Sequence, residues 1–176
     1  APPSQVGMQG WLRKNLFSTP LYSVLTVVLG GLILWFIWDV FQWAIVTAIW
    51  TGSLKDGGGT LTTQSGVLAD APYTFATRFE GQKGLNPEEL VGAAHAGCYA
   101  MFLSALMSGA GITPDRIEAT STISLDPTTE GGPTVKAAHL DVTVKAPTDE
   151  ATIRDFAEKA KAGCPISKLL KADVSL

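Results

Sequence analysis

The sequence predicts an α+β domain that follows one membrane-spanning helix. All five tryptophans and a long charge-free apolar run lie before residue 51, whereas most charged residues lie after it. Beyond residue 60, short alternating segments typical of strands are interleaved with segments of helical period. We therefore divide the 176 residues into an N-terminal membrane anchor (1–52), a glycine-rich linker (53–59) and an α+β domain (60–176).

Composition and charge exclude several classes of protein. The net charge is −3 and only 16% of residues are charged. The chain is therefore neither a strongly basic nucleic-acid binder nor a charge-rich disordered chain. Two cysteines and two histidines are too few for a disulfide framework or a four-cysteine zinc module. We expect no metal site and no nucleic-acid partner.

The run from Leu21 to Trp38 carries no charged residue. As a helix it spans roughly 27 Å at about 1.5 Å per residue, close to the ~30 Å hydrocarbon core of a bilayer. We expect a transmembrane helix at about 19–38, followed by an interfacial segment at about 40–50. A signal peptide is disfavoured because no A-x-A cleavage site follows the run. A buried core helix is disfavoured because such helices are rarely apolar on every side. An aromatic belt at one interface would contain Trp35, Trp38, Trp43 and Trp50.

Two features flank this helix. Asp39 at its end is expected to snorkel to the interface, and the alternative is pairing with a cation of another subunit. Arg13 and Lys14 precede the helix, whereas the other flank offers only Lys55 beside Asp56. The positive-inside rule then favours a cytoplasmic N-terminus and a periplasmic domain, with a cytoplasmic domain as the alternative.

The segments WLRKNLFSTPLYSVLTVVLG and WAIVTAIWTG resemble the start of the permease subunits of bacterial polar amino-acid ABC transporters. The resemblance covers about residues 10–52, which is one helix of a multi-helix protein. It implies a single-pass anchor in the bacterial inner membrane rather than transport by this chain alone.

The central helix of the domain is expected at 86–107. Asn86 is a good N-cap, Pro87 suits the first helical position, and Glu89 stands at the capping-box position. The helix is nearly all apolar, so we expect it to form the core of the domain. Its apolar residues at helical spacing are Leu90, Ala94, Cys98, Met101, Phe102 and Ala105.

The other elements follow from alternation and charge. Acidic residues near 149 and lysines near 160 suit the two ends of a second helix. Gly163 ends that helix, and Pro165 opens a short one with Cys164 as its N-cap. The expected strands are Thr60–Gln64, Tyr73–Phe79, Ile117–Leu125, Lys136–Lys145 and the final ADVSL, and the second helix is expected at Thr148–Ala162.

The two cysteines are the candidate redox residues. Cys98 lies mid-helix on an apolar face, where a small buried hydrophobe is the alternative interpretation. Cys164 lies at a helix N-terminus, which favours a thiolate, although a plain cap is the alternative. His95 is either a base for the Cys98 thiol or, as we favour, a satisfied core histidine. Glu88 is not needed for capping, which Glu89 explains.

The stretches SGVLADAPYTFATRFEGQKGLNPEELVGAAHAGCYAMFLS and AEKAKAGCPISKLLKADVSL make residues 58–176 resemble the OsmC/Ohr family of peroxide-reducing proteins, closer to OsmC than to Ohr. The resemblance implies antiparallel sheets around a long central helix. It also implies an interlocked homodimer with active sites at the subunit interface.

By position, the resemblance assigns Cys98 as the peroxidatic cysteine and Cys164 as the resolving one. It assigns Arg78 to stabilise the thiolate and polarise the peroxide, and Glu88 to hold Arg78. The cysteines would form a sulfenic acid and then a disulfide, which an external dithiol reduces, without metal or organic cofactor. Candidates for an apolar wall around the substrate are Tyr73, Phe75, Met101 and Phe102.

Two functions are therefore expected. The first is a membrane-anchored thiol peroxidase that reduces organic hydroperoxides. The alternative is an accessory single-span subunit that joins other transmembrane subunits in a larger complex, with the domain as a dimerisation scaffold. A periplasmic domain favours the second, because the cysteine pair would rest as a disulfide there.

Overall fold

The computed structural model describes residues 7–42 and 45–176, without the side chains of 39–42. Trp43 and the side chain of Asp39, both named in the predictions above, lie outside this description. The chain forms two compact units. The first contains Ala1–Trp50 and Thr60–Ala71, and the second contains Thr51–Gly59 and Pro72–Leu176.

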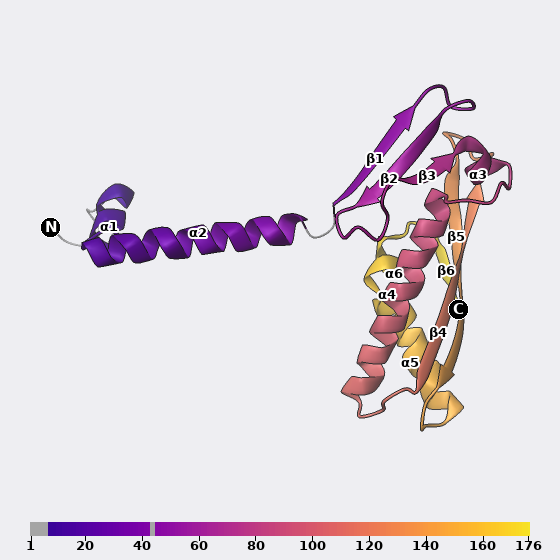
Figure 1. Cartoon of the computed structure of the whole chain (residues 1–176). Helices are drawn as coiled ribbons and strands as arrows, with labels where there is room; N and C mark the ends of the chain where they lie inside the picture. The colour runs from indigo at the N-terminus through magenta and orange to yellow at the C-terminus, as the bar shows by residue number, and fades with distance from the viewer. Residues whose placement is uncertain (1–6, 43–44) are drawn as a thin grey trace. The chain divides into compact units, whose positions relative to one another are not determined.

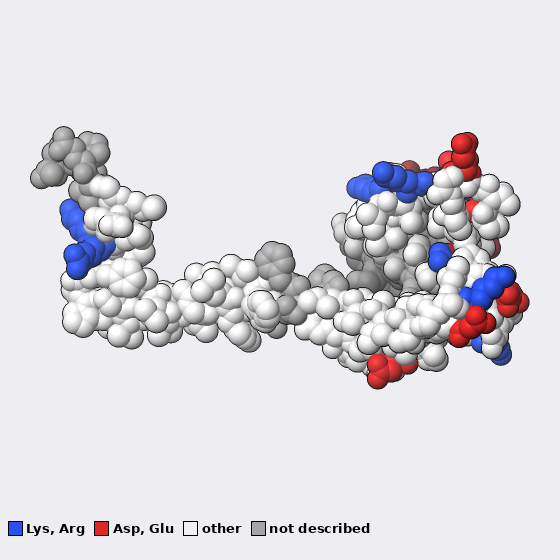
Figure 2. Space-filling model, turned by 90° about the horizontal axis from the view of Figure 1, so that it is seen from above, with Lys and Arg blue, Asp and Glu red and all other residues white. Residues whose placement is uncertain are grey.

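Helices α1 (Met8–Asn15) and α2 (Pro20–Gln42) open the first unit (Figure 1). Pro20 starts α2 at the position where proline is tolerated, and the Thr19 hydroxyl accepts a hydrogen bond from the Tyr22 N–H at 3.2 Å. By length and composition, Pro20–Trp38 is apolar enough to cross a membrane, and none of it is buried. In the view of Figure 2, the described part of this helix shows no charged side chain. The central helix of the domain, Pro87–Gly109, is also long and apolar enough to cross a membrane.

The predicted interfacial segment at 40–50 is not one structural element. Helix α2 continues to Gln42, and strand β1 (Val46–Thr51) follows. The sequence of β1, VTAIWT, is rich in β-branched and aromatic residues, which favour a strand. Strands β1, β2 (Gly58–Thr63) and β3 (Ala71–Thr74) form the first sheet in that order.

The predicted linker at 53–59 is a tight turn that leads directly into β2. A Cβ atom at Gly57 would collide with the carbonyl oxygens of Thr51 and Ser53, so glycine is required there. Asp56 closes the turn by accepting a hydrogen bond from the Ser53 hydroxyl at 2.9 Å.

The predicted strand Tyr73–Phe79 is wrong over most of its length. Strand β3 ends at Thr74, and Phe75–Phe79 form the short helix α3. The reason is a capping box: the Thr74 hydroxyl accepts from the Thr77 N–H at 3.2 Å, and the Thr77 hydroxyl accepts from the Thr74 N–H at 3.0 Å. Arg78 therefore lies on a helix rather than at the end of a strand.

Helix α4 (Pro87–Gly109) confirms the predicted central helix, and the Asn86 side chain caps it by accepting from the Glu89 N–H at 2.8 Å. Not every apolar residue at helical spacing belongs to the core, because Met101 is 77% exposed. Since this helix is apolar on nearly every side, its composition did not indicate which face is buried. The buried residues of α4 are Gly92, His95, Tyr99, Leu103 and Met107.

The second sheet and two further helices complete the α+β fold that the sequence predicted (Figure 1). Strands β4 (Arg116–Asp126) and β5 (Thr134–Lys145) pair antiparallel, and β6 (Asp173–Ser175) pairs parallel with β5. Helices α4 and α5 (Glu150–Gly163) pack on each other, and both contact α6 (Pro165–Leu169). The core contains Tyr99, Leu103, Met107, Leu140, Ala160 and Cys164.

Candidate redox site

The fold brings two cysteines together that are 66 positions apart in the sequence. The Sγ atoms of Cys98 and Cys164 lie 3.3 Å from each other, and both cysteines are free thiols. A disulfide bond is about 2.05 Å long, so the two sulfurs are in contact but not bonded. A small approach of the two sulfurs would be enough to form a disulfide.

Local structure fixes Cys164 in this position. The residue ends α5 and precedes α6, which Pro165 opens. A Cβ atom at Gly163 would overlap the ring of Phe102, so glycine lets the end of α5 approach α4 closely. Cys164 is fully buried as a result, whereas Cys98 is half-buried.

The surroundings shift the two thiols in opposite directions. Burial raises the pKa of Cys98, and the hydrogen bond from the Ile166 N–H offsets this only in part. Burial by itself would also raise the pKa of Cys164. Hydrogen bonds from the Ser167 backbone N–H, the Cys98 thiol and the Ser167 hydroxyl outweigh it and lower that pKa. Within one chain, these surroundings favour the thiolate form of Cys164 and disfavour that of Cys98.

Arg78 and Glu88 form the ion pair that the resemblance implied. The Arg78 Nη2 atom lies 2.6 Å from Glu88 Oε1, and Arg78 Nε lies 3.2 Å from both carboxylate oxygens. The guanidinium also lies 5.0 Å from the centre of the Phe79 ring. This fork geometry fixes the orientation of the guanidinium.

Within one chain the structure does not bring this guanidinium to Cys98. Glu88 and Cys98 are ten residues apart on α4, which is about 15 Å of helix rise. Arg78 is held at the Glu88 end because α3 precedes the first turn of α4. The expectation that Arg78 ionises Cys98 is therefore not met by the contacts of a single chain.

The four candidates for an apolar wall lie in two places. Tyr73 and Phe75 lie where β3 meets α3, and the rings of Phe75 and Phe79 are 5.0 Å apart. Met101 and Phe102 lie on α4 next to the cysteine pair in sequence, where Phe102 packs against Gly163. Met101 points into solvent, so these four residues do not line one pocket in a single chain within the described residues.

The histidine next to this site is satisfied in the core, as we favoured. His95 is fully buried, with Nδ1 2.8 Å from the Ser121 hydroxyl and Nε2 2.9 Å from the Ser167 hydroxyl. Burial lowers the pKa of His95. Sequence reasoning missed both serines, because they lie on β4 and α6 and belong to no recognisable motif.

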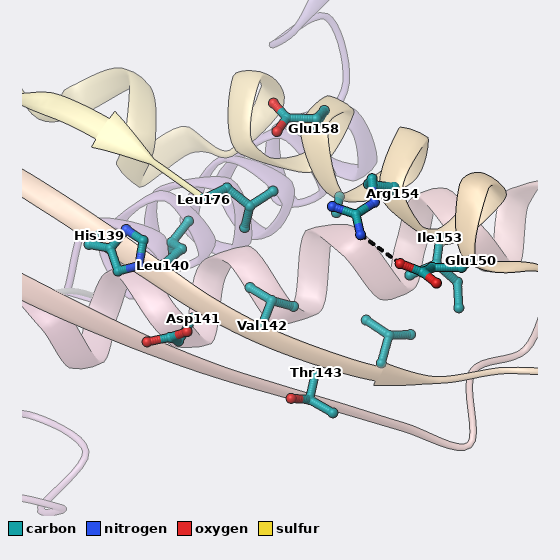
Figure 3. A pocket seen from close by; sticks show the side chains of 12 residues that line it. His139, Leu140, Asp141, Val142, Thr143, Glu150, Ile153, Arg154, Glu158 and Leu176 are labelled. Atoms are coloured by element: carbon teal, nitrogen blue, oxygen red, sulfur yellow. Dashed lines mark hydrogen bonds and ion pairs between the residues drawn. The ribbon is translucent and has the colours of Figure 1, made fainter.

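A cavity of about 650 Å³ lies away from the cysteines, between β5 and α5 and beside Leu176 (Figure 3). The Arg154–Glu150 ion pair, with a 2.6 Å contact, lies on its lining (Figure 3). The segments that line it do not carry Cys98 or Cys164. Across residues 7–42 and 45–176, no three His, Cys, Asp or Glu side chains gather as a metal site.

The sequence and the fold are similar to those of known proteins. A family described as OsmC-like protein matches residues 80–176. The chain is 48% identical over 129 residues to the peroxiredoxin OsmC of Escherichia coli (strain K12) and to that of Shigella flexneri, covering 73% of this chain and 90% of each relative.

Solved structures show the same fold. The organic hydroperoxide resistance protein OhrB of Bacillus subtilis matches with a TM-score of 0.59 and 28% identity over 75% of this chain and 96% of its own. An organic hydroperoxide resistance protein OsmC from Legionella pneumophila matches with a TM-score of 0.56 over 74% of this chain and 95% of its own. At 23% identity, the second likeness concerns the fold alone.

Proposed function

Because this chain belongs to the OsmC-like protein family, we propose that it is a thiol-dependent peroxidase that reduces organic hydroperoxides at Cys98. The observation that carries the proposal is the 3.3 Å contact between the Cys98 and Cys164 sulfurs in a chain of this family. Two thiols in contact can be oxidised to a disulfide and reduced again without unfolding the domain.

The proposed reaction has three steps. The Cys98 thiolate attacks one oxygen of the O–O bond, the bond breaks, and the alcohol leaves after taking a proton. Cys98 is then a sulfenic acid. The Cys164 sulfur attacks the Cys98 sulfur, an S–S bond forms, and the sulfenic oxygen leaves as water. An external dithiol reduces the disulfide and restores both thiols.

Burial supports this division of roles between the cysteines. Cys98 is half-buried, so a peroxide can reach its sulfur, whereas Cys164 is fully buried behind it. A buried thiol reacts poorly with a solution oxidant but is well placed to attack an adjacent sulfenic acid. Access and the family resemblance both support the proposed roles of Cys98 and Cys164.

We further propose that the working unit is a homodimer in which a second copy completes the site. One face of α4 carries only small or apolar exposed residues: Ala94, Gly97, Met101 and Ala105. An apolar stripe of this kind is typical of a buried interface. A second copy on this face would cover it and would supply the guanidinium that Cys98 lacks in a single chain. Tyr73 and Phe75 of that copy would complete an apolar wall with Met101 and Phe102.

The apolar helix α2 supports a membrane location for the proposed enzyme. Its window Pro20–Trp38 has a mean hydropathy of 2.1, and none of it is buried in the chain. We propose a single-pass anchor in the bacterial inner membrane, and the charge bias of Arg13 and Lys14 favours a periplasmic domain. The resemblance of residues 10–52 to permease subunits stays a prediction. Protease accessibility of the domain in right-side-out vesicles determines its side of the membrane.

The exposed helix also supports the second candidate, an accessory subunit of a larger membrane complex. In that case α2 would pack against helices of other subunits, and the redox pair would be idle. Extraction in a mild detergent separates the two candidates. A stoichiometric complex without peroxidase activity favours the accessory role, whereas an active dimer excludes it.

Peroxide consumption by the purified full chain tests the main proposal. In a mild detergent, the chain is expected to consume tert-butyl hydroperoxide with dithiothreitol as reductant. The Cys98→Ser variant is expected to lose this activity. The Cys164→Ser variant is expected to accumulate a sulfenic acid that dimedone traps. Turnover by Cys98→Ser at the rate of the unchanged chain would reject the proposed role of Cys98.

A further inference from the structure

A chain of hydrogen bonds runs from the cysteine pair into the core and ends at His95. The Ser167 hydroxyl lies 2.9 Å from His95 Nε2, and it also forms a hydrogen bond to the Cys164 sulfur. On the other side of the ring, His95 Nδ1 lies 2.8 Å from the Ser121 hydroxyl. The Cys164 sulfur in turn touches that of Cys98 at 3.3 Å.

We propose that His95 is a positioning residue for the resolving step, in which it takes the Cys164 proton through the Ser167 hydroxyl. This inference rests on the proposed peroxidase function and adds to it a route for one proton. Three elements hold the route together, since His95 lies on α4, Ser121 on β4 and Ser167 on α6.

The geometry determines which nitrogen of His95 can act. With Nδ1–H donating to the Ser121 hydroxyl oxygen, Nε2 carries a lone pair that faces the Ser167 hydroxyl. When the Ser167 O–H turns to Nε2, its oxygen can accept from the Cys164 S–H, which in the structure donates to the Cys98 sulfur at 3.3 Å. Burial lowers the pKa of His95, so near neutral pH the ring is neutral and Nε2 keeps its lone pair.

The proton transfer leaves each group with a suitable partner. The Cys164 S–H proton moves to the Ser167 oxygen as the Ser167 O–H proton moves to Nε2. The Ser167 hydroxyl then donates to the new thiolate, which is one of the hydrogen bonds that lower the pKa of Cys164. His95 is now a cation that donates from both nitrogens, to Ser121 and to Ser167.

The electron balance of the resolving step is unchanged by this route. The Cys164 thiolate attacks the sulfur of the Cys98 sulfenic acid, the S–S bond forms, and the S–O bond breaks. The oxygen leaves as hydroxide with the electron pair of that bond, and a proton from solvent converts it to water. His95 later releases its proton to solvent, so the net change is thiol plus sulfenic acid to disulfide plus water.

Other titratable groups near His95 do not replace it. Tyr99 is one turn further along α4 and fully buried, and burial raises its pKa to about 12, so it stays protonated. The two cysteines are the reacting groups themselves. Ser121 and Ser167 are the side chains that the described structure places within hydrogen-bond distance of the His95 ring, and neither carries charge.

The experiment measures the two oxidation steps separately on the full chain in detergent. The reduced protein is mixed with tert-butyl hydroperoxide, quenched with acid at increasing times, and its sulfenic acid and disulfide forms are counted by intact-protein mass spectrometry. The variants are His95→Gln and Ser167→Ala. The matched control is His139→Gln, because His139 forms a similar bond to Ser175 at 2.7 Å on β5, away from the cysteines.

His95→Gln and Ser167→Ala are expected to form the sulfenic acid at the unchanged rate and to form the disulfide about 100-fold more slowly near pH 7. Their disulfide step should rise about tenfold per pH unit, because hydroxide must now remove the Cys164 proton. The unchanged chain should show a much flatter profile. The double variant should be no slower than either single variant, since both residues act on one proton.

The outcomes separate this inference from the proposed function. If the unchanged chain forms neither sulfenic acid nor disulfide, the peroxidase function fails and this inference fails with it. If the unchanged chain forms both, and His95→Gln and Ser167→Ala keep its disulfide rate and pH profile, the inference alone is overturned. Equal slowing of both steps at every pH would mean a purely structural role and would also overturn it.

Discussion

Helix α4 passes so close to the second sheet at Gly92 that an alanine there should destabilise the domain. A Cβ atom at this position would lie 2.9 Å from the Ser121 carbonyl oxygen and 3.5 Å from Ile123 Cγ1. The carbonyl cannot move away easily, because β4 is paired along its length with β5, with Ser121 opposite Leu140. Relief therefore requires a shift of the helix or of the strand.

The size of the effect follows from two opposing contributions. Added volume in a packed core typically costs about 1–3 kcal/mol. Replacing glycine by alanine inside a helix gains about 0.5–1 kcal/mol. We expect Gly92→Ala to lower the free energy of unfolding by about 1–2 kcal/mol. The shift should also disturb the bond between His95 Nδ1 and Ser121, which starts one helical turn from Gly92.

Gly97→Ala is the matched control, because it makes the same change five residues further along the same helix. No atom lies within 4 Å of a Cβ built at Gly97, so within the chain no steric clash opposes the stabilisation that alanine brings to a helix. The free energies of unfolding of both variants are measured by urea unfolding in a nonionic detergent, followed by far-ultraviolet circular dichroism. Repeating the measurement at a second protein concentration separates any effect of dimer formation from that of packing within the chain. A Gly92→Ala chain as stable as Gly97→Ala would refute the argument from close packing.

Three further predictions concern the ion pair, the α4 face and the buried histidine. Arg78→Lys keeps the positive charge but loses the two-pronged contact with Glu88, so kcat/KM for an alkyl hydroperoxide should fall about tenfold or more. The control Arg154→Lys changes an exposed ion pair and should leave kcat/KM unchanged. Equal losses in both variants would contradict this prediction. Met101→Lys should convert the dimer to monomers, as measured by light scattering after size-exclusion chromatography. Val67→Lys places the same charge at another exposed apolar residue and should leave the dimer intact. A dimer that persists in Met101→Lys would argue against the α4 interface. Burial lowers the pKa of His95 below its ordinary value of 6.5, so as the pH falls the histidine of the unfolded chain takes up a proton before that of the folded chain. The free energy of unfolding should therefore decrease as the pH falls below 6.5. Urea midpoints of the unchanged chain and His95→Gln across that range check this, and an identical decline in both would contradict it.

Several elements of the fold could be read from the sequence because each has a clear local signal. The alternation in 117–125 and 136–145 predicted β4 and β5, since exposed residues alternate with less exposed ones along each strand. The Asn86-Pro87 pair located the start of α4 to the residue, because a side-chain cap and a proline act there together.

Other features depend on competition that local composition does not resolve. Residues 73–79 are aromatic and β-branched, but the hydroxyls of Thr74 and Thr77 cap each other and start a helix instead. The composition of α4 could not indicate its buried face because the helix is apolar nearly all round, and packing against β4, α5 and α6 selects the buried side. In each case a tertiary or capping interaction outweighs the average preference of the segment.

The candidate site divides in the same way. The two cysteines stood out in the sequence because there are only two, yet nothing local pairs residues 66 positions apart, and the pairing came from the family resemblance. The serines on either side of His95 were not recognised, because serine is common and these two lie on different elements. A buried histidine needs partners for both nitrogens, and that requirement could have prompted a search for them.

The electrostatics of a single chain suit only half of a peroxidase cycle. Cys164, whose pKa is lowered, is buried and meets no peroxide, whereas Cys98, whose pKa is raised, is the sulfur that a peroxide can reach. A thiol with a raised pKa is a poor nucleophile at neutral pH, so the first step needs a cation beside Cys98. Arg78 is the guanidinium that the family assigns to this task, and in its own chain it is fixed to Glu88, about 15 Å of helix from Cys98. A single chain therefore suits the resolving step, and the attack on peroxide should depend on dimer formation. When the protein is diluted, the specific activity should fall in step with the fraction of dimer. A specific activity that stays constant while the dimer dissociates would contradict this.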